Sequence, residues 1–108
     1  RRQRQMCIRD SFPTLNDEEH IKFCLFNAAE ESYSKVLKIE TQKFVPQGVT
    51  GFALLADSHI SIHTWPEKGI AMCDIFTCGD HCEPQNAVDY LSRWLSSTNT
   101  ISQCYERI

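Results

Sequence analysis

The stretch that decides the fold is "FALLADSHISIHTWPEKGIAMCDIFTC", residues 52–78. Its centre, "HISIHTW", alternates strictly, so Ile60 and Ile62 face one way while His59, Ser61 and His63 face the other. This period of two predicts a strand with one buried face and one open face. "FALLA" before it is too apolar for an exposed strand, which predicts a central one. Pro66 and Gly69 mark a turn into a third strand, "IAMCDIFTC".

The flanking segments predict two helices and two more strands. "NDEEHIKFCLFNAAEESYS" reads as a helix with Asn16 as N-cap, Glu19 in a capping-box position, and an apolar stripe of Ile21, Cys24, Leu25 and Ala28. "EPQNAVDYLSRWLSS" reads as a second helix that begins near Pro84 and buries Ala87, Leu91, Trp94 and Leu95. "KVLKIETQKF", in which Val36 is out of phase with Leu37 and Ile39, and "TISQCYERI" read as strands.

Between the first of these strands and "FALLA", the loop "VPQGVTG" carries turn residues, and Gly51 permits close backbone approach. Tight turns between the middle strands imply antiparallel pairing. We therefore predict an α+β two-layer sandwich, a mainly antiparallel sheet with both helices packed on one face. The other face is expected to be open and to carry His59 and His63.

Composition is that of one soluble domain. The 108 residues are 42% hydrophobic and 23% charged, and no apolar run approaches the roughly 20 residues of a membrane span. No secretory signal precedes the six cysteines, so we expect reduced thiols and a cytoplasmic protein. The net charge of −3 argues against nucleic acid as the main partner.

The opening "RRQRQMCIRDS" has no amphipathic period and holds four arginines. It reads as a nucleic-acid-binding arm or as foreign sequence. We interpret residues 1–11 as a non-native tail, because they match the translation of a sequencing adapter. Without them the net charge moves from −3 to −6, since four arginines and Asp10 are lost. The domain is then residues 12–108.

Three kinds of chemistry suit the polar residues. A zinc site would draw on His59, His63, Cys73, Cys78, His81 and Cys82, but two histidines about 13 Å apart along a strand do not share one ion. Hydrolysis by Ser or Cys with His lacks a nucleophile-elbow motif. In the third, a serine hydroxyl attacks the preceding carbonyl, and elimination leaves a pyruvoyl group.

Residues 46–80, and above all "SHISIHTWPE" followed by "DIFTCG", closely resemble the small prokaryotic form of S-adenosylmethionine decarboxylase, a self-processing pyruvoyl enzyme. Looser agreement extends over residues 15–108. The resemblance implies a proenzyme cut between Asp57 and Ser58 into a β chain (12–57) and an α chain (58–108). Ser58 becomes the covalent pyruvoyl cofactor, which binds the substrate amine as a Schiff base.

The resemblance also implies roles for five other residues. His63 is the base of processing, Thr50 assists it, and Cys78 protonates the substrate carbon. Phe44 stacks on adenine and Glu67 holds the ribose hydroxyls, both reaching a neighbouring subunit in a homodimer. A sulfonium substrate gains from an aromatic face. S-adenosylmethionine is the expected substrate, spermidine synthesis the expected purpose, and no metal, membrane or nucleic-acid partner is expected.

Three departures from the family pattern matter. Asp57 replaces the usual Glu, which predicts slower or altered cleavage, and Thr50 replaces the usual Ser. The family's opening strand has no counterpart, so the chain is expected to be an N-terminally truncated metagenomic fragment. Alternation also places Ser58 and His63 on opposite faces, so a bulge or strand-end bend at Ser58, or release of the new N-terminus, is needed to bring them together.

The alternatives are an ornithine or arginine decarboxylase on the same scaffold, an unprocessed dimeric homologue without catalysis, and a small zinc-stabilised domain.

Overall fold

The computed structural model describes residues 2–9, 12–56, 58–77, 83–95 and 99–106. Within them the chain forms six strands, three α-helices and one 3₁₀ turn. The elements are β1 (Arg2–Arg9), α1 (Phe12–Leu15), α2 (Glu18–Glu31), β2 (Val36–Lys43), β3 (Val49–Leu55), β4 (His59–Trp65), η1 (Pro66–Lys68), β5 (Ile70–Thr77), α3 (Pro84–Trp94) and β6 (Asn99–Glu106).

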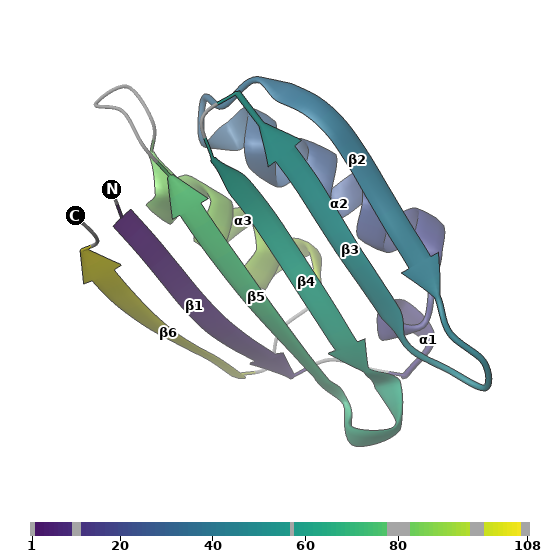
Figure 1. Cartoon of the computed structure of the whole chain (residues 1–108). Coiled ribbons are helices and arrows are strands. Elements are labelled where there is room, and N and C mark those ends of the chain that lie inside the picture. The colour runs from purple at the N-terminus through teal and green to yellow at the C-terminus, as the bar shows by residue number, and fades with distance from the viewer. Residues whose placement is uncertain (1, 10–11, 57, 78–82, 96–98, 107–108) are drawn as a thin grey trace.

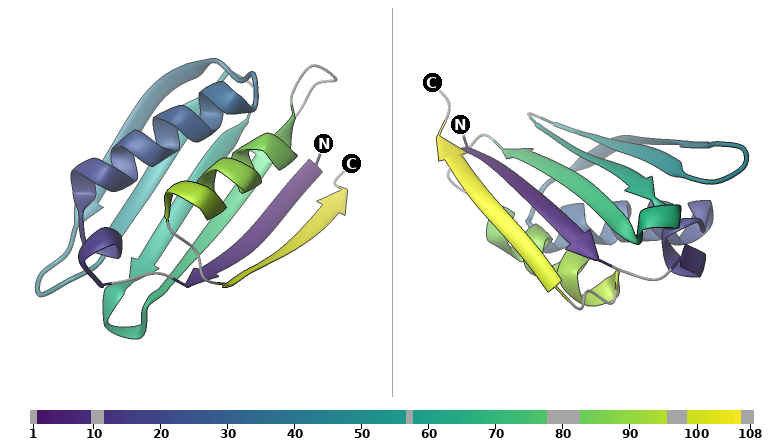
Figure 2. Two further views of the ribbon diagram at one scale, coloured as in Figure 1. Left: turned by 180° about the vertical axis from the view of Figure 1, so that it is seen from behind. Right: turned by 90° about the horizontal axis from the view of Figure 1, so that it is seen from below.

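The strands form one sheet in the order β2-β3-β4-β5-β1-β6, and every neighbouring pair is antiparallel. Both long helices lie on the same face, α2 across β2 to β4 and α3 across β5 and β1 (Figures 1 and 2). The other face carries no helix. The predicted two-layer α+β sandwich is therefore confirmed.

The opening residues are the main correction. We expected residues 1–11 to lie outside the domain and the family's first strand to be missing. Arg2–Arg9 instead form β1, between β5 and β6, and Met6 and Ile8 are buried in the core. An arginine-rich strand is compatible with this place because Met6 and Ile8, two residues apart, point to one face. The adapter-like origin of these residues remains a hypothesis.

Helix boundaries differ from the prediction by small steps. The N-cap of α2 is Asp17 and not Asn16, since the Asp17 carboxylate accepts a hydrogen bond from the His20 backbone N–H at 3.1 Å. The stripe of Ile21, Cys24, Leu25 and Ala28 is buried as predicted. Trp94 was expected in the core but is 46% exposed, because it lies on the outer side of α3 against Phe23 and Tyr90.

In β2 the predicted alternation holds from Ile39 onward but is wrong at Leu37. A register shift between Val36 and Lys38 changes which side chains face the helices. Val36 and Ile39 consequently pack against the core, while Leu37 is 54% exposed. A bulge of this kind, with one extra residue on one strand, leaves little trace in a period-two pattern.

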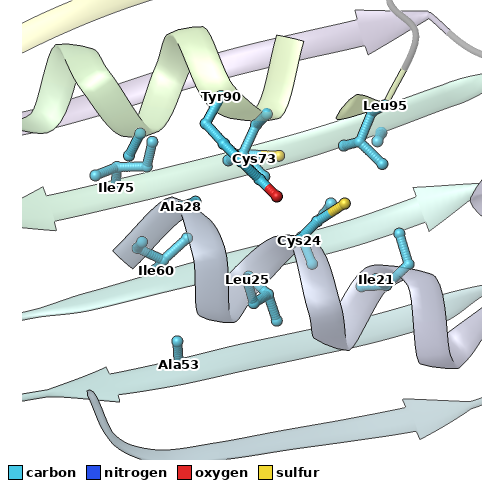
Figure 3. Close-up of a cluster of buried hydrophobic side chains, with 14 of the residues drawn as sticks. Ile21, Cys24, Leu25, Ala28, Ala53, Ile60, Cys73, Ile75, Tyr90 and Leu95 are labelled. Carbon is cyan, nitrogen blue, oxygen red and sulfur yellow. The ribbon is translucent and has the colours of Figure 1, made fainter. Parts of the chain in front are cut away.

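The core lies between the two layers (Figure 3). Ile60 and Ile62 of β4 are fully buried there, as their alternation predicted. Gly51 of β3 lies directly beneath α2: a Cβ at this position would come within 2.7 Å of Leu25 Cδ1. Any larger residue here would force the side chains of Leu25 and Ile62 to shift, so glycine lets the helix approach the middle of the sheet closely.

Candidate active site

A pocket of about 280 Å³ opens at the end of the sheet where β3 begins and β4 ends. Four predicted site residues line it, although they come from different parts of the chain. Phe44 comes from the loop after β2, Thr50 from β3, His63 from β4 and Glu67 from η1. The remaining lining residues are Gln47, Gly48, Thr64 and Trp65. Sheet pairing thus brings the residues of two sequence motifs together.

Thr50 and His63 face each other across β3 and β4 as a register pair. Thr50 Oγ1 lies 3.1 Å from His63 Nδ1, within hydrogen-bond distance. The indole of Trp65 lies at 6.3 Å from the imidazole, centroid to centroid. The imidazole is exposed on the open face, so its Nε2 edge is available to a partner from outside the chain.

The loop that carries Phe44 is held by two side chains that the sequence did not connect with this loop. Asn16 Oδ1 accepts a hydrogen bond from Gly48 N at 2.9 Å. Thr64 Oγ1 accepts one from Val49 N at 2.8 Å and donates one to Leu15 O at 2.8 Å. The buried hydroxyl of Thr64 therefore joins three segments of the chain. Its position opposite the Gly-Val-Thr turn is visible only once the register is known.

Ser58 lies at the opposite end of β4, in the connection from β3. Ser58 O accepts a hydrogen bond from Leu55 N at 3.0 Å, which closes a tight turn. Its Oγ is buried and has no hydrogen-bond partner among the described residues. A buried hydroxyl without a partner is unfavourable, and such groups occur where chemistry requires them.

One chain does not bring Ser58 and His63 together. Five residues of strand at about 3.3 Å each separate them by roughly 16 Å. Ser58 is buried, whereas His63 is exposed on the open face. Sequence alternation predicted this opposition, and β4 itself pairs regularly from His59 to Trp65. Two further predicted site residues, Asp57 and Cys78, lie outside the described residues.

Large apolar side chains are exposed on the open face of the sheet. Phe52, Leu54, Trp65 and Met72 are between 38% and 51% exposed, and they extend from the pocket to the Ser58 end. Figure 1 shows this face of the sheet in front, with α2 and α3 behind it. Such a face on a small domain is typical of a protein interface.

Metal-binding groups do not gather in the described part of the chain, where no three His, Cys, Asp or Glu side chains come together. His59 and His63 lie four residues apart along β4, as expected. Cys78, His81 and Cys82 fall outside the described ranges. None of the helices in those ranges is long and apolar enough to cross a membrane.

Comparison with known proteins identifies the class to which this fold and site belong. The family model for S-adenosylmethionine decarboxylase matches residues 7–107. The proenzyme of Prochlorococcus marinus is 45% identical over 93 residues, which are 86% of this chain and 74% of that protein. The proenzyme of Methanococcus maripaludis is 44% identical over 86 residues, covering 80% of this chain and 70% of its own.

The crystal structure of adenosylmethionine decarboxylase from Aquifex aeolicus superposes with a TM-score of 0.90. It is 33% identical, and the match covers 98% of this chain and 88% of that one. This chain therefore belongs to the S-adenosylmethionine decarboxylase family. The match of the family model from residue 7 onward includes the end of β1.

Proposed function

We propose that the chain is the proenzyme of a pyruvoyl-dependent S-adenosylmethionine decarboxylase that cuts itself between Asp57 and Ser58. The observation that carries this proposal is the pocket at the start of β3, in which Phe44, Thr50, His63 and Glu67 converge. The product, decarboxylated S-adenosylmethionine, is the aminopropyl donor for spermidine synthesis. The free thiols of Cys7 and Cys73 agree with a cytoplasmic location.

Processing uses the chain's own groups. Ser58 Oγ attacks the carbonyl carbon of Asp57, and the amide becomes an ester with its nitrogen released as the amine of residue 58. Removal of the α-proton of residue 58 by a base expels the Asp57 carboxylate. The resulting enamine takes up water and loses ammonia, which leaves a pyruvoyl group on the new chain end. Ser58 Oγ, which has no hydrogen-bond partner among the described residues, fits this role.

His63 is the base in this scheme, and Thr50 is its hydrogen-bond partner. In the tautomer whose Nδ1–H donates to Thr50 Oγ1, the hydroxyl orients the imidazole and Nε2 is the atom that takes the proton. Because His63 and Ser58 are far apart within one chain, this base serves the Ser58 of another copy.

Two copies related by a twofold axis satisfy that requirement. If the open faces of two sheets pack together about a twofold axis that runs across the strands, β4 of one copy runs antiparallel to β4 of the other. The His63 end of each then lies over the Ser58 end of its partner. The exposed side chains of Phe52, Leu54 and Met72 are buried by the same packing. The proposal is therefore a homodimer with two composite sites.

The pocket residues have the chemistry of an adenosyl sulfonium site. The Phe44 ring is 47% exposed beside the pocket and offers a face to adenine or to the sulfonium charge. Glu67 accepts hydrogen bonds from the ribose hydroxyls. Cys78 is assigned by resemblance to protonate the substrate carbon. The pyruvoyl group supplies a carbonyl that holds the substrate amine and accepts the electron pair released with carbon dioxide.

Intact-mass analysis of the purified protein tests the proposal. We expect two chains that meet at residues 57 and 58, the second carrying the pyruvoyl mass, and a single uncut chain for Ser58→Ala. Release of labelled carbon dioxide is then compared for S-adenosylmethionine, ornithine and arginine. A wild-type chain that stays whole supports a non-catalytic homologue instead. If the chain is cut but releases carbon dioxide only from ornithine or arginine, it is a decarboxylase of those amino acids instead.

A further inference from the structure

His59, the residue directly after Ser58, lies between two aromatic rings on the open face. Its imidazole stacks on Phe52 of β3 with centroids 5.5 Å apart and planes inclined by 20°. On the other side it stacks on Phe76 of β5, again at 5.5 Å and inclined by 7°. Asp74 Oδ2 lies 3.9 Å from His59 Nε2. The first residue of β4 is thus held from both neighbouring strands.

This position becomes important when the chain is cut. Before the cut, residue 58 is held by peptide bonds on both sides. Afterwards the pyruvoyl group is a chain end, joined to the protein only through the backbone nitrogen of His59. The first residues of a chain fray unless other contacts hold them. A catalytic carbonyl on such an end loses its fixed geometry unless the next residue is anchored.

The backbone alone anchors this residue incompletely. β4 begins at His59, where the strand pairs with Leu54 of β3 and Phe76 of β5. The terminal pairs of a ladder open most readily. The side chain of His59 adds contacts with both flanking strands at this end, and Phe52 and Phe76 are themselves fixed within β3 and β5.

We propose that His59 is a positioning residue that holds the pyruvoyl end of β4 in place through its stack with Phe52 and Phe76. This inference rests on the proposed function, since it concerns the same cut. It assigns His59 a role after cleavage and through ring stacking, distinct from the proton transfer assigned to His63. The aromatic ring is the required element, and its nitrogen atoms are dispensable.

Three variants distinguish the role of the aromatic ring from that of its nitrogen atoms. His59→Ala removes the ring, and His59→Phe keeps an aromatic ring without nitrogen. Ser61→Ala alters the next residue on the same face of β4, which pairs in register with Phe52 but has no ring to stack on it, and is the matched control. For each we would measure cleavage by intact mass, kcat and KM for S-adenosylmethionine, and hydrogen exchange of the peptide spanning residues 59–65.

His59→Ala should cut at 57–58 like the wild type. Its kcat should fall by about tenfold with KM changed less than about twofold, because the reacting carbonyl is misplaced while the binding pocket is intact. Exchange of the first amides of β4 should rise by about tenfold. His59→Phe should restore both values to within about threefold, and Ser61→Ala should match the wild type.

A His59→Phe variant no better than His59→Ala overturns the proposal, since the imidazole nitrogens would then be needed. A His59→Ala variant that fails to cut, or that keeps wild-type exchange, overturns it as well. Failure of the proposed function is seen separately, as a wild-type chain that remains whole. The exchange comparison still decides the stacking role in that uncut chain.

Discussion

Thr50 Oγ1 and His63 Nδ1 are 3.1 Å apart because the two residues form a register pair of β3 and β4. The hydrogen bond therefore depends on strand pairing and on a hydroxyl at position 50. The methyl group that distinguishes threonine from serine leaves this hydrogen bond in place.

Removal of that hydroxyl should slow self-cleavage. We expect Thr50→Val to reduce the cleavage rate by at least about tenfold, within the range by which positioned acid–base groups act. Thr50→Ser should cut at the wild-type rate or faster. The measurement is a time course of intact mass after synthesis in a cell-free system. Equal rates for the valine and serine variants would contradict the assigned role of Thr50.

A mixed-dimer experiment tests whether the site is built from two copies. Ser58→Ala and His63→Ala chains, each uncut alone, are produced together with tags of different mass. The His63→Ala chain has an intact Ser58 and should be cut by His63 of its Ser58→Ala partner. The Ser58→Ala chain should remain whole. Absence of any cut product in the mixture would place His63 and Ser58 in the same chain.

Thr64 should contribute strongly to stability. Thr64→Val keeps the shape of the side chain but leaves Val49 N and Leu15 O without their partner. Each unpartnered buried group costs about 1–3 kcal/mol, so we expect a loss of about 2–4 kcal/mol in the free energy of unfolding. Urea denaturation measures it. Thr64→Ser, which keeps both hydrogen bonds, should lose less than half as much.

Burial of Cys73 predicts a pH dependence of stability. Burial raises the pKa of its thiol well above the ordinary value of 9.0, with smaller contributions from Cys24, Cys7 and Asp74. Above pH 9 the unfolded chain loses this proton while the folded chain keeps it. Stability therefore falls as pH rises past 9, by up to about 1.4 kcal/mol per pH unit for this thiol.

Comparison with Cys73→Ala isolates the effect of this one group. Urea midpoints measured from pH 8 to pH 10.5 should fall less steeply for the alanine variant than for the wild type. The same burial predicts that a thiol reagent modifies Cys73 only after unfolding. Parallel stability curves for the two proteins would show that Cys73 ionises in the folded state.

The middle of the fold could be predicted from sequence because local patterns determine it. The alternation of Ile60 and Ile62 fixes the faces of β4, and Pro66 with Gly69 fixes its turn into β5. The place of β1 could not be predicted, since its partners lie about 70 residues away along the chain. Nothing local shows that Arg2–Arg9 enters between two strands.

Some features of the candidate site could likewise be predicted from the sequence, and others could not. The two-residue period of a strand alone predicted that Ser58 and His63 lie on opposite faces of the sheet. The expected roles of Phe44, Thr50 and Glu67 came from the family resemblance. Their convergence in one pocket required the register of β3 and β4. Thr64 was missed because its partners, Val49 and Leu15, are distant in sequence. The stack on His59 was missed for the same reason.

The strand order has a consequence for a chain cut after residue 57. One piece then contains β1, β2 and β3, and the other contains β4, β5 and β6. In the sheet these pieces interleave, because β1 lies between β5 and β6 while β3 lies beside β4. Three ladders of hydrogen bonds join one piece to the other. The two products of the cut are thus woven together, and neither can leave without dismantling the sheet.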